Sequence, residues 1–289
     1  MAQRERIGII GLGRMGAPIA ARLREGGVVL STWDPQVDST SSSARELAAN
    51  VDVLITVLPG SPELRDVMVG VNGALTSMAP GALWLDLTSA DPRVAREIAE
   101  AATARGIHSV GCPMGGGPQG AAAGELSFFV GGAATSIDRV RPILELLGAR
   151  ITVMGDDIGA GYTTKLLANT LWFGQAVAVA EALLLGQAQR IELRALRDAL
   201  EGSAAGSRFI SEHLAALFDG DYLETFGIDR VVEELEAVRD LAAEAGTPAG
   251  LTGLVTETHR DALAEFGAID GELLGIKLLE LRAGRELRP

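Results

Sequence analysis

The sequence predicts an α/β N-terminal domain followed by an all-α C-terminal domain. Short apolar runs alternate with helical patterns over residues 1–158, and a Gly-x-Gly-x-x-Gly turn directly follows the first run. From residue 159 onward, alanine- and leucine-rich helical stretches dominate. Because strands that alternate with helices over short connections form mostly parallel, doubly wound sheets, we expect one domain at 1–158 and a second at 159–289.

Apolar runs predict the strands of the first domain at 6–10, 28–33, 53–57, 82–87, 107–110, 127–130 and 151–153. Helices are predicted at 15–25, from Ser61-Pro62 onward, and from Asp91-Pro92 to about residue 105, since proline favours the first turn of a helix. The segment 111–120 is predicted to be a glycine loop, and 34–43 a polar loop.

Glycines punctuate the helices of the second domain, which are predicted at 162–188, 192–201, 204–217, 228–245, 249–266 and 270–283. Residues 166–186 are long enough to span a bilayer. They include Asn169, Gln175 and Glu181, and no second segment of this kind exists. We therefore expect a long helix buried between domains and no membrane association.

Composition limits the class of partner. The 289 residues carry a net charge of −13, which argues against nucleic acids and anionic membrane surfaces. Cys112 is the single cysteine, and no Cys/His cluster has metal-ligand spacing, so no metal site is expected. The N-terminal apolar run is too short for a signal peptide, and a cytoplasmic location is predicted.

The turn at residues 11–16 has the pattern of a dinucleotide-binding fingerprint of the Rossmann type. Gly11 permits the tight turn, Gly13 lets the backbone approach a pyrophosphate, and Gly16 allows the helix to pack close to the strand. Helix N-terminal N–H groups then bind the phosphates. The cofactor-binding residues predicted here are Gly11, Leu12, Gly13, Arg14, Met15 and Gly16.

Asp34 ends the second predicted strand, close to the spacing at which a carboxylate accepts hydrogen bonds from the adenine ribose. It would repel a 2′-phosphate, and residues 34–44 contain no Lys or Arg. NAD is therefore predicted over NADP. Leu58 and Pro59, after the third strand, and Thr88, after the fourth, are also assigned to cofactor binding.

Two further segments follow strand ends, where open α/β sheets bind ligands. Thr88 and Ser89 supply hydroxyl groups there, although Asp91-Pro92 also reads as a simple helix cap. Gly115, Gly116 and Gly117 could offer successive N–H groups to an anion, or form a plain surface loop.

Lys165 and Asn169 stand four residues apart at the start of a predicted apolar helix, after Gly159 and Gly161. A lysine at the head of a buried helix is costly to desolvate unless its ammonium has a role. A surface lysine is the alternative.

Together these motifs resemble the β-hydroxyacid dehydrogenases, which include 3-hydroxyisobutyrate dehydrogenase and are related to 6-phosphogluconate dehydrogenase. The resemblance covers essentially the whole chain through four motifs in order, at 11–16, 86–92, 116–121 and 161–169. It implies an NAD(P)-dependent oxidoreductase that transfers a hydride between nicotinamide and a β-hydroxy acid, or a related amino-acid or semialdehyde substrate. Lys165 would be the general acid/base and Asn169 its partner, with Thr88, Gly116 and Gly117 holding the substrate carboxylate.

The chain departs from the family pattern. Gly115 replaces a serine, Ala168 replaces the first of two asparagines, and Glu233 stands where the family has a lysine. The last change hints at a larger, less anionic or amine-bearing substrate, unless Glu233 points outward. Alternatives are an imine reductase on the same fold, which usually lacks this lysine, and a non-catalytic dinucleotide-binding module.

The apolar helical domain predicts a homodimer, since leucine- and alanine-rich faces remain to be covered. The expected ligands are NAD and a small-molecule substrate.

Overall fold

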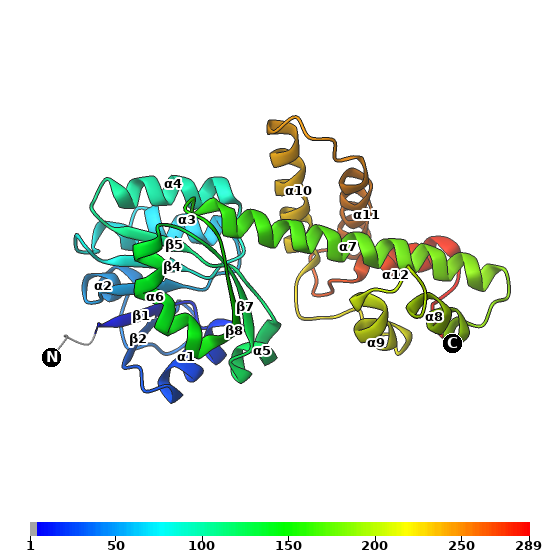
Figure 1. The fold of residues 1–289 in the computed structure, drawn as a ribbon, viewed down its shortest axis with the longest axis horizontal. Coiled ribbons are helices and arrows are strands. Elements are labelled where there is room, and N and C mark those ends of the chain that lie inside the picture. Colours follow the sequence, from blue (N-terminus) through cyan, green and yellow to red (C-terminus); the bar gives the residue numbers. More distant parts are fainter. Residues whose placement is uncertain (1–4) are drawn as a thin grey trace. The chain divides into compact units, whose positions relative to one another are not determined.

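The computed structural model describes residues 5–289, which form two compact units (Figure 1). The first unit ends at Lys165, and the second comprises Leu166–Pro289. The α/β unit and the following all-helical unit confirm the predicted fold class. The exact domain boundary at 158/159 stays a prediction, and the helix that begins at Gly159 contributes its first turns to the first unit.

One eight-stranded sheet organises the first unit, in the order β2-β1-β3-β4-β5-β7-β6, with β8 paired to β7. Strands β1 to β5 are parallel. The strand order changes direction at β1, which has β2 on one side and β3 on the other. Doubly wound sheets bind ligands at such switch points. The strands are β1 (Ile7–Ile10), β2 (Leu30–Trp33), β3 (Val53–Thr56), β4 (Leu83–Asp86), β5 (His108–Gly111), β6 (Met114–Gly115), β7 (Leu126–Gly131) and β8 (Gly148–Gly155).

Strand register places the carboxyl ends of the parallel strands in one row. Ile10 pairs with both Trp33 and Thr56, Thr56 pairs with Asp86, and Asp86 pairs with Gly111. Residues that directly follow these positions in the sequence therefore share one edge of the sheet.

Helices cover both faces of this sheet (Figure 1). Alternation along each strand separates the two cores: Ile9, Ile55 and Leu85 pack with α1, α5 and α6, whereas Leu54 and Trp84 pack with α2, α3 and α4. The helices are α1 (Gly16–Glu25), α2 (Ala44–Ala49), α3 (Ser61–Val69), the 3₁₀ turn η1 (Ala74–Thr76), α4 (Pro92–Thr103), α5 (Gly117–Ala123) and α6 (Ala134–Leu147).

Three of these helices differ from the sequence-based expectation, and one of them, α2, lies in a segment for which no element is predicted. The segment predicted as a glycine loop contains α5, because Pro118 occupies its first turn and a run of alanines follows. Helix α6 was assigned no element, although Ile137, Val140 and Leu144 give it a buried face at helical spacing.

The second unit is built on α7 (Gly159–Ala188), whose Phe173, Ala180 and Leu183 enter its core. The predicted helix at 204–217 begins only at Phe209, because Ser203 and Gly206 form turns before it. The remaining elements are α8 (Leu193–Glu201), one π-helical turn η2 (Phe209–His213), α9 (Leu214–Phe218), α10 (Ile228–Glu244), α11 (Gly250–Phe266) and α12 (Leu274–Ala283).

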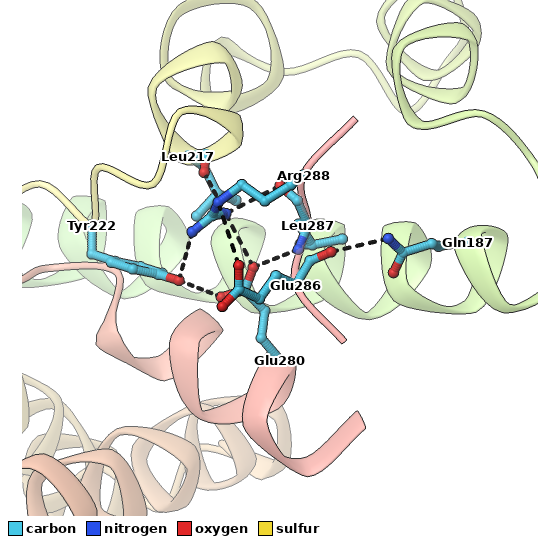
Figure 2. A network of polar contacts seen from close by, with 7 residues as sticks. All are labelled: Gln187, Leu217, Tyr222, Glu280, Glu286, Leu287 and Arg288. Atoms are coloured by element: carbon cyan, nitrogen blue, oxygen red, sulfur yellow. Dashed lines mark hydrogen bonds and ion pairs between the residues drawn. The ribbon is translucent and has the colours of Figure 1, made fainter. Parts of the chain in front are cut away.

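A polar network fastens residues 286–288 to the helical unit (Figure 2). Glu280, only 3% exposed, accepts hydrogen bonds from the Tyr222 hydroxyl (2.5 Å) and the Leu287 N–H (2.7 Å). Arg288 lies beside the same carboxylate and also donates to the Leu217 carbonyl (3.0 Å). The Leu287 side chain is fully buried, so this segment is part of the folded unit.

Candidate active site

The turn between β1 and α1 has the three glycine properties that a phosphate-binding turn needs. Gly11 has a φ of +94°, and a Cβ there would collide with the Val57 carbonyl oxygen. A Cβ on Gly16 would collide with the Gly11 carbonyl oxygen. A Cβ on Gly13, by contrast, would meet no atom within 4 Å. The turn is therefore tight at its ends and open at its tip, where a pyrophosphate could approach the backbone.

Asp34 joins this turn to the end of β2. The Leu12 N–H donates to Asp34 Oδ2 (2.7 Å), and the Gln36 N–H donates to Oδ1 (2.8 Å). These bonds hold the half-buried carboxylate beside the glycine turn, as the fingerprint predicts. Of the other residues predicted in the turn, Met15 is half-buried and precedes α1 without a side-chain cap, while Arg14 is exposed.

The segments after β3 and β4 lie next to each other at the same edge. The Leu58 N–H donates to the buried Thr88 Oγ1 (3.1 Å), so the predicted cofactor and substrate segments are joined directly. Pro59 is exposed and Ser89 is half-buried beside them. The register thus brings together Leu58, Thr88, Ser89, Asp34 and the glycine turn at one edge.

A buried carboxylate that the sequence analysis did not single out as functional lies in the middle of this edge. Asp86 is fully buried and accepts hydrogen bonds at Oδ1 from Thr56 Oγ1–H (2.6 Å) and from the Thr88 N–H (3.2 Å). Its Oδ2 accepts from the Tyr162 hydroxyl (2.5 Å). Burial raises the pKa of Asp86 to about 6, against the effect of these donors.

The start of α7 packs against the ends of β5 and β7 through glycine contacts. A Cβ on Gly111 would collide with the Tyr162 ring, and a Cβ on Gly161 would collide with the Phe129 carbonyl oxygen. Arg96 forms an ion pair with Asp157 (2.6 Å), which also accepts the Gly159 N–H (3.1 Å). Close packing and this ion pair therefore fix the helix start at the carboxyl edge of the sheet.

Lys165 follows Tyr162 by three residues in α7 and is half-buried. One helical turn separates positions three to four apart, so Lys165 comes one turn after the anchored Tyr162. Lys165 is therefore one helical turn further along α7 than the residue that contacts Asp86.

The glycine segment after β6 adopts left-handed backbone. Gly116 has a φ of +118° and Gly117 a φ of +61°, and both are exposed. A Cβ on Gly115 or Gly117 would meet no atom within 4 Å. These positions leave the backbone open to a ligand, as a carboxylate-binding loop requires.

In the second unit, Asn169 Nδ2 donates to Glu234 Oε2 (2.6 Å). Glu234 is 7% exposed, whereas its neighbour Glu233 forms an ion pair with Arg230 (3.0 Å). The carboxylate bonded to Asn169 is therefore Glu234, which the sequence analysis passed over. Its position was readable, because it lies three residues after buried Val231 and four before buried Val238.

Trp172 and Phe173, which directly follow the Asn169 turn, pack in the core of the second unit. Phe173 is buried, and the Trp172 ring lies edge-on to Phe209, with 5.3 Å between ring centroids. Among residues 5–289, no group of three or more His, Cys, Asp or Glu side chains could hold a metal ion.

Known protein families account for nearly the whole chain. Residues 6–155 match the NAD binding domain of 6-phosphogluconate dehydrogenase, and residues 159–279 match the NAD-binding family of NADP-dependent 3-hydroxyisobutyrate dehydrogenase. The NAD-dependent L-serine dehydrogenase of Pseudomonas aeruginosa is 37% identical over 213 residues, 70% of this chain and 71% of the relative. The 3-hydroxyisobutyrate dehydrogenase of the same organism is 34% identical over 70% of each chain.

Solved structures give the same picture. The Mycobacterium tuberculosis 3-hydroxyisobutyrate dehydrogenase with L-serine superposes with a TM-score of 0.85 at 27% identity, covering 96% of this chain and 99% of that one. An imine reductase from Myxococcus stipitatus reaches a TM-score of 0.65 at 17% identity over 96% of this chain and 100% of that one, and so shares the fold. The chain belongs to the 3-hydroxyisobutyrate dehydrogenase-like β-hydroxyacid dehydrogenases, NAD(P)-dependent enzymes that act on the CH–OH group of hydroxy acids.

Proposed function

We propose that this protein is an NAD-dependent dehydrogenase of β-hydroxy acids in which Lys165 is the general acid/base. The observation that carries the proposal is the anchoring of the start of α7 at the carboxyl edge, through Tyr162 and the glycine contacts. The sequence contains two lysines, Lys165 and Lys277, and one of them lies within a turn of this anchor.

The chemistry divides between the cofactor and the chain. NAD⁺ held at the glycine turn and Asp34 would supply the acceptor for the hydride of the carbinol carbon, so that the C–OH group is oxidised to C=O. Lys165 Nζ takes up the hydroxyl proton in this direction and returns it to the oxygen in the reverse direction. Asn169 orients the substrate oxygen, while Thr88 and the N–H groups of Gly116 and Gly117 hold the substrate carboxylate. Ser89 and Gly115 line the same carboxylate site.

Lys165→Ala tests the role of the lysine, with Lys277→Met as the matched control. Lys277 Nζ lies 5.2 Å from the centroid of the Tyr222 ring and 5.3 Å from that of Phe266, in the core of the second unit. We expect Lys165→Ala to bind NAD normally and to lose roughly 10²–10⁴-fold in kcat, whereas Lys277→Met keeps its turnover. Unchanged kcat in Lys165→Ala would remove the proposal.

NAD is proposed over NADP because the Asp34 carboxylate is held beside the glycine turn by the Leu12 N–H. A fixed negative charge there repels a 2′-phosphate and accepts ribose hydroxyl groups. Wild type should have a higher kcat/KM with NAD than with NADP. Asp34→Ser should lower the ratio of these two kcat/KM values. A lower KM for NADP in wild type contradicts this preference.

L-Serine is the first substrate to test, since an L-serine dehydrogenase is among the relatives and the Glu234 carboxylate of α10 bonds to Asn169. We propose that Glu234, with Glu233 beside it, favours substrates that carry an ammonium group. L-Serine and 3-hydroxypropionate differ only in that group, so the ratio of their kcat/KM values measures the preference. Glu234→Gln should reduce this ratio, and an unaltered ratio would argue against the acidic pair.

We propose a homodimer in the cytoplasm. By length and composition α7 could cross a membrane, but the core helices of soluble proteins meet the same criterion. Three leucines are exposed on it, Leu167, Leu171 and Leu185. A second copy of the chain would cover these leucines. Light scattering should give twice the chain mass, and Leu171→Glu should shift it toward the monomer. A monomeric wild type at micromolar concentration would exclude this assembly.

A further inference from the structure

The Asp86 carboxylate is linked to three segments that the proposed mechanism uses, two of them directly and the third through Thr88. Oδ1 accepts the Thr88 N–H, and Thr88 Oγ1 in turn accepts the Leu58 N–H. Oδ2 accepts the Tyr162 hydroxyl at the start of α7. One fully buried side chain therefore connects the cofactor segment, the carboxylate-binding segment and the helix that carries Lys165.

The Tyr162 ring is held in a slot that only a glycine at position 111 leaves open, since a Cβ there would collide with the ring. Tyr162 is fully buried. Its hydroxyl is therefore fixed by packing as well as by its bond to Asp86. A side chain fixed in this way transmits a shift of Asp86 to the backbone of α7 without taking it up in a rotamer change.

We propose that Asp86 and Tyr162 are positioning residues that fix the first turns of α7, and thereby Lys165, relative to Thr88 and the cofactor segment. This inference rests on the proposed role of Lys165. A shift of about 1 Å in a reacting group can cost on the order of 10²-fold in rate, so a single hydrogen bond at this point influences turnover.

The protonation state of Asp86 should control this function. As a carboxylate it accepts hydrogen bonds from Thr56, Thr88 and Tyr162. A protonated Asp86 carries a hydroxyl that must itself donate, so it can no longer accept all three of these bonds. The titratable groups that face it are Tyr162 from α7 and Cys112 from the segment after β5, and burial raises the pKa of both well above their usual values. Both stay neutral near pH 6, so Asp86 is the group of this cluster that titrates there.

The test compares Tyr162→Phe and Asp86→Asn with wild type, using the hydroxy acid that gives the highest turnover. Thr164→Val is the control, because it removes a hydrogen bond to the Ala160 carbonyl from the same region of α7 (2.9 Å) without touching Asp86. For each protein, kcat and KM are measured from pH 5 to 9, and NAD binding and thermal unfolding are measured alongside.

Tyr162→Phe should lower kcat by roughly 10- to 100-fold while the Kd for NAD changes by less than about 2-fold. Its kcat should also fall off at higher pH than in wild type, since loss of a donor to the carboxylate favours protonation. In Asp86→Asn this acid limb should disappear, and Thr164→Val should match wild type.

Unchanged kcat and an unchanged acid limb in Tyr162→Phe would overturn the inference. So would a loss of activity that only follows the loss of folded protein. If Lys165→Ala is inactive while Tyr162→Phe equals wild type, the positioning role fails alone. If Lys165→Ala keeps its turnover, the proposed catalytic role fails first.

Discussion

Removing Arg288 should destabilise the helical unit more than neutralising the carboxylate beside it. Glu280 is 3% exposed, and Arg288 Nη1 lies 3.4 Å from its Oε1 (Figure 2). Breaking a buried ion pair from one side costs about 3–5 kcal/mol, because an uncompensated charge stays buried. The Arg288 side chain is 31% exposed and the contact is long. We therefore expect Arg288→Ala to lower the free energy of unfolding by about 2–3 kcal/mol, which is less than for a fully buried pair.

Glu280→Gln should lower the free energy of unfolding by about 1 kcal/mol or less. The amide oxygen can still accept from the Leu287 N–H, the amide NH₂ can donate to the Tyr222 hydroxyl oxygen, and no charge is left buried. The double variant should then be close to Glu280→Gln, so the two changes are not additive. Urea unfolding followed by circular dichroism measures all four proteins. Additive losses, or a smaller loss in Arg288→Ala than in Glu280→Gln, would refute the reasoning.

Two further predictions concern the sheet edge. Gly16→Ala should lower the melting temperature and weaken NAD binding at least about 10-fold, because its Cβ would collide with the Gly11 carbonyl oxygen; Gly13→Ala should fold as wild type and weaken NAD binding alone, since its Cβ meets no protein atom. Calorimetric titration and thermal unfolding separate the two, and a destabilised Gly13→Ala would contradict the open tip. Burial raises the pKa of Asp86 from 3.8 to about 6, so ionising it disfavours the folded state. The free energy of unfolding of wild type should therefore fall by about 3 kcal/mol relative to Asp86→Asn between about pH 3 and pH 7. If the free energy of unfolding depends on pH in the same way in wild type and Asp86→Asn, ionising Asp86 does not destabilise the fold and the prediction is wrong.

Local sequence patterns were enough to predict much of the fold and to select several candidate site residues. The glycine turn could be predicted from sequence because backbone contacts require Gly11 and Gly16, whereas Gly13 leaves the tip of the turn open. These local requirements give a fixed spacing. The apolar strands and most of the helices followed from periodicity. Thr88 is predicted as a site residue because it lies two residues after a strand end, where ligands of open sheets bind.

The rest depended on contacts between distant positions. Asp86 and Tyr162 are 76 residues apart in the chain, and no local pattern shows that a helix start will bring a hydroxyl group to a buried strand end. Whether Glu233 or Glu234 contacts Asn169 depends on the direction of each side chain on α10, which the resemblance to the family motifs does not give. Helix α6 lies in a segment for which no element is predicted, although its apolar residues recur at helical spacing and would have supported that prediction.

The slot for the Tyr162 ring has a consequence for the evolution of this subfamily. A methyl group at position 111 and an aromatic ring at position 162 exclude each other, so the two sites should mutate in concert among relatives. Homologues with alanine or serine at the first site should carry a small residue at the second. Such relatives would need another bond to fix the helix that carries Lys165, and covariation between positions 111 and 162 would identify the relatives that use the Tyr162 bond.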